Sequence, residues 1–180
     1  MKNIQEIYQN KIISHFKKDL GYTNDLEVPR IEKIIVNTGV GKKVIEDPKF
    51  LEIAISDLSQ ICGQKPKVVK SKKAISGFKL KKGAPTGLVV TLRRKRMFDF
   101  LEKLINIVLP RIRDFRGLKK GAVDNFGNLN IGISDMTVFP EIKPDQVIKS
   151  FSLQINIVTT AKNSKNAKEL LKSYGFIFQE

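Results

Sequence analysis

The amino-acid sequence predicts an α+β fold in which helices pack on one face of an antiparallel sheet and leave its other face open. Two observations lead to this prediction. Several segments alternate apolar and polar residues, as strands with one buried face do, and others repeat apolar residues at the three- and four-residue spacings of helices. The chain has 180 residues, 41% of them hydrophobic, which suits a globular protein. We therefore expect one domain, residues 1–180.

Four segments have the pattern of amphipathic helices, and each has a recognisable boundary. Glycine ends a helix readily because it accepts a left-handed backbone, and an Asp-Pro pair starts one. The predicted helices are 3–16 (followed by Gly21), a helix from Asp47-Pro48 to Gly63, 96–109 (closed by Pro110), and a helix from the cap Ser164 to about Tyr174 with Gly175 behind it.

Five segments have the pattern of strands, namely 31–38, 67–71, 87–94, 128–134 and 152–160. Because successive side chains of a strand point to opposite faces, their alternation puts Asn37, Thr91 and Arg93 on the polar face of the sheet. A long segment rich in lysine and glycine, about residues 72–86, joins two of these strands, and we expect it to be a mobile basic loop.

Positive charge is concentrated in one part of the chain. Lysine and arginine number 33 against 18 acidic residues, a net charge of +15 with a pI near 9.9. Residues 65–96 hold 12 of the basic residues and no acidic one, so the other 148 residues are nearly balanced. A one-sided block of this kind favours a polyanionic partner. Glycines and a proline interrupt the block, which argues against a membrane-binding helix and favours nucleic acid.

The segment IIVNTGVGKK, residues 34–43, resembles the start of a nucleotide-binding loop but lacks residues that such loops require. A phosphate-binding loop needs glycine where Val36 stands and a hydroxyl residue where Lys43 stands. A dinucleotide fingerprint needs a third glycine at Val44. We therefore interpret Gly39 and Gly41 as a tight turn in which glycine adopts a positive φ.

Other candidates for chemistry have plainer interpretations. His15 is the single histidine and Cys62 the single cysteine, so neither a metal cluster nor a catalytic triad can be assembled around them. Asp99 and Glu102 have the spacing of residues on the solvent-exposed face of an amphipathic helix. We expect no catalytic residue, no metal and no cofactor. Two alternatives stay open: a magnesium-dependent RNA nuclease that uses Asp99, Glu102 or Asp114, and a non-specific DNA-coating protein.

Targeting signals are missing from the sequence. No apolar run approaches 18 residues and no signal-peptide core is present. A single cysteine fits a reducing compartment. We expect a soluble protein that is not secreted and binds neither a membrane nor a small-molecule substrate.

Several motifs in fixed order resemble the family of large ribosomal subunit protein five, in its bacterial and organellar form. The resemblance covers nearly the whole chain. The motifs are VPRIEKIIVNTGVG (28–41), GQKPKVVKSKKAISGFKLKKGAPTGLVVTLR (63–93), RIRDFRGL (111–118), FGNLNIGI (126–133), FPEI (139–142) and TTAK (159–162).

The resemblance implies a non-enzymatic ribosomal protein, in the cytoplasm or in an organelle, that binds 5S ribosomal RNA (5S rRNA) and helps attach it in the central protuberance. The other implied partners are large-subunit rRNA, peptidyl-site transfer RNA and neighbouring ribosomal proteins, including a small-subunit head protein near RIRDFRGL. The positions implied to contact 5S rRNA are Asn37, Thr38, Gly39, Gly41, Gln64, Lys65, Thr91 and Arg93. Those implied to face transfer RNA are Lys72, Lys73, Lys79, Lys81 and Lys82.

The sequence departs from the family pattern at two places. Phe126 stands where the family commonly has a basic residue before the glycine, and residues 93–96, RRKR, are more basic than is usual. The extra charge is expected to strengthen non-specific RNA binding.

Overall fold

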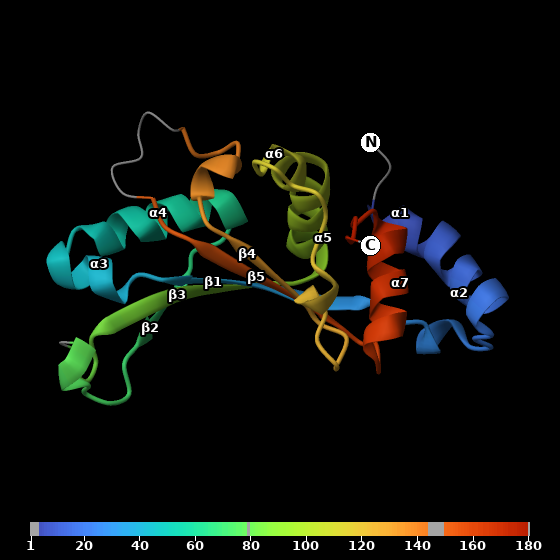
Figure 1. Ribbon diagram of the computed structural model, residues 1–180, viewed down its shortest axis with the longest axis horizontal. Helices are drawn as coiled ribbons and strands as arrows, with labels where there is room; N and C mark the ends of the chain where they lie inside the picture. The colour runs from blue at the N-terminus through green and yellow to red at the C-terminus, as the bar shows by residue number, and fades with distance from the viewer. Residues whose placement is uncertain (1–3, 79, 144–149, 180) are drawn as a thin grey trace. The chain divides into compact units, whose positions relative to one another are not determined.

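The computed structural model describes residues 4–78, 80–143 and 150–179. It has an α+β fold with a five-stranded antiparallel sheet in the order β2-β3-β1-β5-β4, which confirms the predicted class (Figure 1). The strands are β1 (Ile31–Gly39), β2 (Lys67–Lys70), β3 (Pro85–Leu92), β4 (Leu129–Ile133) and β5 (Leu153–Thr159). Strands β2 and β3 pair in an antiparallel register that places Lys67 opposite Val89.

The helices occupy all four segments that the sequence predicts. They are α1 (Ile4–Ile7), α2 (Ile13–Leu20), α3 (Gly41–Glu46), α4 (Phe50–Cys62), α5 (Arg94–Lys103), α6 (Leu109–Arg111) and α7 (Ser164–Tyr174). Two π-helical stretches, Tyr8–Ile12 and Leu104–Val108, join α1 to α2 and α5 to α6. Gly21, Gly63 and Gly175 each end a helix in the left-handed conformation, as predicted.

Several boundaries differ from the prediction. The first helix continues to Leu20, and its predicted residue 3 lies outside the described residues. Helix α3 is not predicted by the sequence, because Gly41 at its start is a poor helix former. Strand β3 ends at Leu92, so Arg93 caps α5 instead of continuing the strand. Pro110 lies within the first turn of α6, where proline is tolerated, and does not close the helix.

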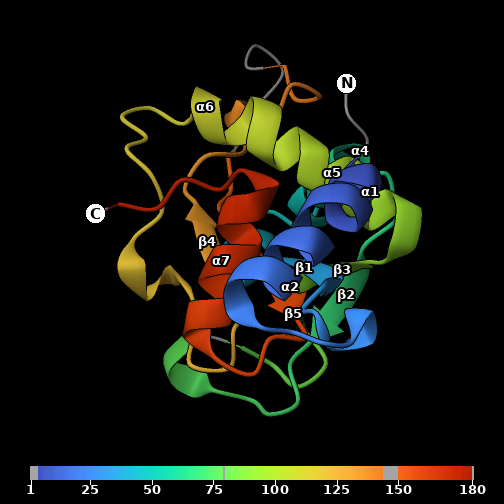
Figure 2. The same cartoon turned by 90° about the vertical axis from the view of Figure 1, so that its right-hand side faces the viewer.

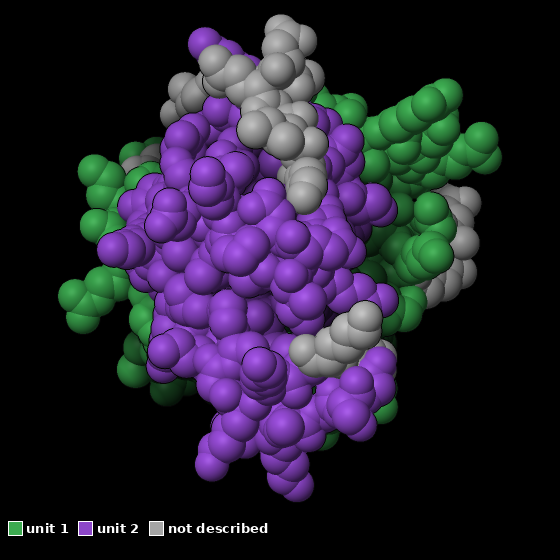
Figure 3. Space-filling view, turned by 90° about the vertical axis from the view of Figure 1, so that its left-hand side faces the viewer, with its two compact units in different colours: residues 1–34, 93–131, 156–180 green, residues 35–92, 132–155 purple. Residues whose placement is uncertain are grey.

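The chain forms two compact units (Figure 3). Unit 1 comprises residues 1–34, 93–131 and 156–180, and unit 2 comprises residues 35–92 and 132–155. Strands β1, β4 and β5 have residues in both units.

Unit 1 is built on the N-terminal helices, α5 and α7. The N-terminal helices and α7 lie side by side in both views (Figure 1 and Figure 2). Ile12 and Phe16 are fully buried, and the Phe16 ring meets the Tyr22 ring at a centroid distance of 5.6 Å. The Tyr8 hydroxyl donates a hydrogen bond to the Val28 carbonyl at 3.2 Å, which links the π-helical stretch Tyr8–Ile12 to the segment that precedes β1.

Unit 2 has its own apolar core beneath α4. Phe50, Leu58 and Ile61 of α4 are almost fully buried, and the helix packs against β3. The Phe50 and Phe151 rings meet edge to face at a centroid distance of 6.2 Å. Burial of these side chains is the main source of stability for this unit.

Strands β3, β4 and β5 alternate buried and accessible residues, as the sequence predicts, whereas β2 has no buried residue. Leu88, Val90 and Leu92 of β3 are buried, whereas Thr91 between them is exposed. Strands β4 and β5 alternate in the same way, and the Asn156 amide donates a hydrogen bond to the Asn130 side chain across them. One side of β3, β4 and β5 therefore belongs to the core, and the other carries groups that water or a ligand can reach.

Candidate nucleic-acid interface

Three polar groups of unit 2, called the polar row below, lie on two neighbouring strands or just after α4. Asn37 on β1 is half-buried, and Thr91 on the adjacent β3 is exposed. Gln64, just after α4, donates a hydrogen bond from its side chain to the Thr91 carbonyl at 3.4 Å. The structure thus brings Gln64 and Thr91 together, and the next residue, Lys65, is exposed. Amide and hydroxyl groups arranged in this way both donate and accept hydrogen bonds, as RNA bases and 2′-hydroxyls do.

The segment Gly39–Val40–Gly41 joins β1 to α3 without the predicted glycine turn. Neither Gly39 nor Gly41 has a positive φ, so that interpretation is wrong. Gly39 ends β1 and Gly41 begins α3, and the Val40 amide is fixed by a hydrogen bond to the Thr86 carbonyl at 3.1 Å. A Cβ added at Gly39 would meet no atom within 4 Å, so open space lies beside its backbone.

Thr38 differs from the other predicted site residues because its side chain is buried. It shares the inward face of β1 with Ile34 and Val36, and its hydroxyl donates to the Ser152 carbonyl at 2.8 Å. Sequence reasoning missed Gly87, whose added Cβ would lie only 2.9 Å from the Thr38 carbonyl oxygen. Gly87 therefore allows β1 and β3 to approach closely at the end of the polar row. A glycine inside an otherwise apolar strand was the available signal.

Arg93 belongs to unit 1. Its backbone is extended, and its guanidinium is 3.3 Å from the Glu32 carboxylate, with both side chains about half exposed. Arg94 follows with a φ of 53°, a conformation that is uncommon for a residue other than glycine. Residues 94–96 are all exposed, so the basic end of this segment is accessible to a ligand.

Backbone hydrogen bonds join the two sides of the basic segment 72–86, called the arm below. Ser71 and Ala84 are joined through the Ser71 amide at 2.8 Å, and Ile75 and Leu80 exchange two backbone hydrogen bonds of 2.9 and 3.1 Å. A short 3₁₀ turn, Ser76–Phe78, lies within it. Lys72, Lys73, Lys81 and Lys82 are exposed, and the predicted Lys79 lies outside the described residues.

The residues considered for catalysis do not form a reactive group. The His15 ring packs edge to face against Phe16 at a centroid distance of 6.0 Å, and Cys62 is buried at the end of α4 as a core residue. Asp99 and Glu102 both lie on α5, separated by the buried Phe100 and Leu101, whereas Asp114 is 88% exposed in the turn after α6. Among residues 4–78, 80–143 and 150–179, no three histidine, cysteine or acidic side chains lie close enough to hold a metal ion.

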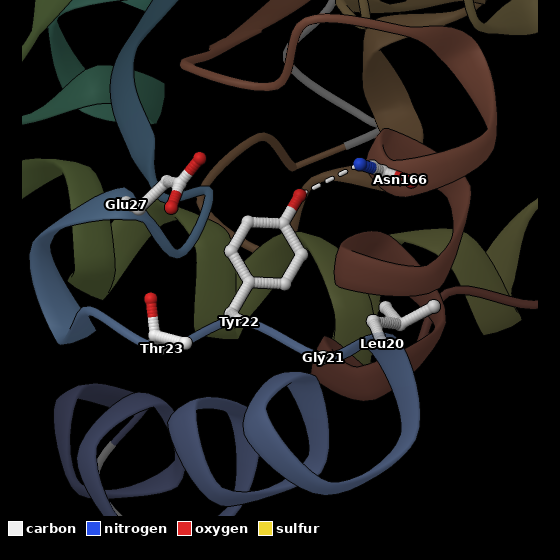
Figure 4. A pocket seen from close by; sticks show the side chains of 6 residues that line it. All are labelled: Leu20, Gly21, Tyr22, Thr23, Glu27 and Asn166. Atoms are coloured by element: carbon white, nitrogen blue, oxygen red, sulfur yellow. Dashed lines mark hydrogen bonds between the residues drawn. The ribbon is translucent and has the colours of Figure 1, made fainter.

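A polar pocket of about 270 Å³ lies in unit 1 (Figure 4). It is lined by Leu20, Gly21, Tyr22, Thr23, Glu27 and Asn166. Its Tyr22 hydroxyl accepts a hydrogen bond from the Asn166 amide at 2.7 Å. The lining holds one carboxylate, that of Glu27, and neither a histidine nor a cysteine.

Shifted pKa values occur away from the polar row. Burial raises the pKa of Asp57 on α4, and burial also raises the pKa of Tyr174 on α7. The Asp135 carboxylate accepts a hydrogen bond from the Thr137 amide, which lowers its pKa despite the opposing effect of partial burial. None of these three groups is a predicted site residue. Within the described part of the chain, no helix is long and apolar enough to cross a membrane.

Comparison with known proteins identifies the family. Residues 24–81 match the model described as "Ribosomal protein L5", and residues 85–178 match the model for the C-terminus of the same ribosomal family. The protein named "Large ribosomal subunit protein uL5" of Desulforapulum autotrophicum is 48% identical over 99% of both chains. Those of Synechococcus and Cupriavidus metallidurans are 47% identical over 98% of both chains, and 46% identical over 98% of this chain and 97% of the relative. The chain belongs to the ribosomal protein L5 family, whose members are structural, non-enzymatic constituents of the large ribosomal subunit.

Proposed function

We propose that this chain binds 5S rRNA and helps attach it in the central protuberance of the large subunit. The observation that carries the proposal is the combination, in unit 2, of an accessible polar row with an acid-free basic segment. Asn37, Gln64 and Thr91 form the row, and residues 65–92 add eight lysines and no acidic residue. A strand face that contacts only water gains nothing from an adjacent segment of purely positive charge. A strand face that binds RNA gains electrostatic attraction from it.

In the proposed mechanism, basic residues provide the affinity for RNA and polar residues provide the selectivity. Lysines and Arg93 attract phosphate groups with an affinity that falls as salt rises, because each contact releases a condensed counterion. Asn37, Gln64 and Thr91 select an RNA shape through hydrogen bonds to bases and 2′-hydroxyls. The open space beside Gly39 lets the RNA approach the backbone there, and Thr38 holds that strand end in place through its bond to Ser152.

Two further contacts complete the proposal, in which the whole chain acts as one RNA-binding domain. The arm 72–86 presents the exposed Lys72, Lys73, Lys81 and Lys82 and reaches peptidyl-site transfer RNA. The segment 111–118 contacts a protein of the small-subunit head; its Arg111, Arg113 and Arg116 are exposed. Arginine suits contacts to a protein and to RNA, because its guanidinium pairs with carboxylates and phosphates alike.

A gel-shift comparison at physiological salt tests the proposed function. The chain is titrated into 5S rRNA, transfer RNA and duplex DNA of similar length. We expect the tightest binding to 5S rRNA, because polar shape selection adds to the common electrostatic attraction. Equal affinity for duplex DNA would favour the DNA-coating alternative. Magnesium-dependent cleavage of the RNA, abolished by alanine at Asp99, Glu102 or Asp114, would favour the nuclease alternative.

A further inference from the structure

The turn at residues 124–128, which leads into β4, is unusually well fixed for a surface loop. Asp124 organises it. The Asp124 carboxylate accepts hydrogen bonds from the Phe126 amide at 3.0 Å, the Asn128 amide at 2.8 Å and the Asn128 side chain at 3.1 Å. Backbone hydrogen bonds from Asp124 to the Asn128 carbonyl at 2.9 Å and from Gly127 to the Asp124 carbonyl at 3.1 Å close the turn.

The pKa of Asp124 is consistent with this arrangement. Partial burial raises the pKa of the carboxyl, but the hydrogen bonds from Asn128, Phe126 and Gly127 together outweigh burial and hold the pKa below its usual value. The carboxylate therefore stays ionised at neutral pH and keeps its acceptor role.

The turn is also anchored to the end of β5 and to α7. The Thr159 hydroxyl donates to the Gly127 carbonyl at 2.7 Å, and the Thr159 amide donates to the Asn128 side chain at 3.3 Å. Gly127 has a φ of +84°, and a Cβ there would lie 3.0 Å from Ala161 and 3.2 Å from Ala167 of α7. Only glycine fits this close contact, so the turn has little freedom to shift.

This fixed turn presents a phenylalanine to solvent. Phe126 is 79% exposed, although its neighbour Gly127 is buried. Single exposed apolar residues are common on protein surfaces. Phe126 differs because five hydrogen bonds within the turn hold its backbone, so a ligand that contacts the ring loses little entropy in ordering it.

Positive charge in the two segments against which the turn packs favours a nucleic-acid partner over an apolar protein surface. The exposed Lys162 follows Ala161, against which the turn packs, and the exposed Lys165 lies in the first turn of α7. The one acidic group of the turn, Asp124, is occupied by its internal hydrogen bonds. Cationic side chains beside an accessible aromatic ring are typical of sites where a base stacks and its phosphate is neutralised.

We propose that Phe126 stacks on an unpaired base of ribosomal RNA, with Lys162 and Lys165 attracting the adjoining phosphates. This proposal rests on the proposed function and adds a second RNA contact, made from unit 1, to the polar row of unit 2. It assigns to a phenylalanine a contact that composition and strand alternation do not indicate.

The chain contains no tryptophan, so Phe126→Trp introduces a single fluorescent reporter at the proposed contact. The probe is deproteinised rRNA from a bacterial large subunit, titrated at physiological salt. The matched control is Leu26→Trp, because Leu26 is 87% exposed on another turn, in which Asn24 accepts a hydrogen bond from the Leu26 amide at 2.9 Å. We expect binding to quench the emission of the Phe126→Trp variant, since the indole stacks on a base, and to leave the control unquenched.

Affinity measurements provide the second test. Phe126→Ala and Phe126→Leu should both weaken rRNA binding, by roughly 10- to 100-fold, because neither offers a flat ring for one base. Retained affinity in Phe126→Leu, or unquenched emission from Phe126→Trp at saturation, would overturn base stacking while leaving the proposed function intact. Failure of the unmodified chain to bind rRNA at all would overturn both proposals.

Discussion

Arg93 illustrates how a single side chain can serve both the fold and the proposed interface. Its guanidinium lies 3.3 Å from the Glu32 carboxylate, and the two side chains are 54% and 46% exposed. An ion pair this exposed contributes at most about 1 kcal/mol to stability. The ion pair therefore orients the Arg93 guanidinium only weakly, and a phosphate can compete with Glu32 for the guanidinium.

Arg93→Ala should weaken 5S rRNA binding by about 1–3 kcal/mol, the loss typical of one charge-assisted hydrogen bond. Glu32→Gln is the matched control, because it breaks the same ion pair while keeping the arginine. The control should bind at least as tightly as the unmodified chain, since it removes a competing negative charge. Filter-binding titrations of both variants check this. If both variants lost the same affinity for 5S rRNA, Arg93 would support binding only through its ion pair with Glu32 and would make no RNA contact of its own.

Gly39 and Gly87 are expected to have different roles. Gly39 lets the RNA approach the backbone, whereas Gly87 lets two strands pack closely. A Cβ at Gly87 would lie 2.9 Å from the Thr38 carbonyl oxygen, whereas a Cβ at Gly39 would meet no atom within 4 Å. Gly87→Ala should therefore lower the free energy of unfolding by about 1–3 kcal/mol, the usual cost of overpacking. Gly39→Ala should leave stability nearly unchanged and weaken 5S rRNA binding.

Urea denaturation followed by a gel shift on the same samples distinguishes the two glycines. A stable Gly39→Ala variant with unchanged RNA affinity would remove the backbone at Gly39 from the proposed interface. A Gly87→Ala variant as stable as the unmodified chain would show that β1 and β3 can separate there without cost.

At the scale of elements, the start of α7 differs by one residue from the start that the sequence predicts. The sequence predicts Ser164 as the cap of the last helix, but Asn163 has the extended backbone of a cap, and its side chain accepts a hydrogen bond from the Asn166 amide at 2.9 Å. Both residue types are good caps, so neighbouring candidates cannot be ranked without the backbone angles.

Asn163→Ala should destabilise the chain by about 1 kcal/mol, because it leaves the Asn166 amide without its acceptor. Ser164→Ala, which keeps the cap, serves as the control and should change stability much less. Thermal unfolding followed by circular dichroism measures both. Equal midpoints for the two variants would show that the cap contributes nothing to the free energy of unfolding.

Elements with a strong period were predictable, and short or strained segments were not. The alternation of β3 and β5 and the spacing of α4 and α7 follow directly from burial of one face, so all nine predicted helices and strands are present. Helix α3 is six residues long and starts with glycine, so local propensity argues against it and tertiary contacts with β3 decide. The hydrogen bonds that pair Ser71 with Ala84 and Ile75 with Leu80 beside the basic loop could not be predicted, because backbone hydrogen bonds leave no periodic trace in the sequence.

The candidate site was predictable to the extent that it follows strand alternation. Asn37 and Thr91 lie on the accessible side of their strands for that reason, and the same rule places Thr38 with the buried residues Ile34 and Val36. The role of Gly87 depends on a distance between two strands, and the fixed turn under Phe126 depends on hydrogen bonds. Neither can be read from residue types alone.

At the scale of the whole molecule, the distribution of charge matters more than its total. Residues 65–96 carry 12 basic residues without an acidic one, and the remainder of the chain is nearly neutral. If total charge governed RNA binding, any five lysines would be equivalent. The proposed division of labour instead assigns transfer RNA contact to the arm 72–86 and 5S rRNA recognition to the polar row.

Replacing the five arm lysines, Lys72, Lys73, Lys79, Lys81 and Lys82, by glutamine should therefore weaken transfer RNA binding more than 5S rRNA binding. The control replaces five lysines of the same charge that are exposed elsewhere in the chain: Lys11, Lys18, Lys49, Lys119 and Lys143. Titrations across a range of salt concentrations measure both variants. Removing one phosphate interaction reduces the slope of log affinity against log salt by roughly 0.7–0.9. An equal decrease in affinity for the arm variant and the control would show that net charge alone sets the affinity. An equal decrease in 5S rRNA and transfer RNA binding by the arm variant would refute the separation between arm and sheet.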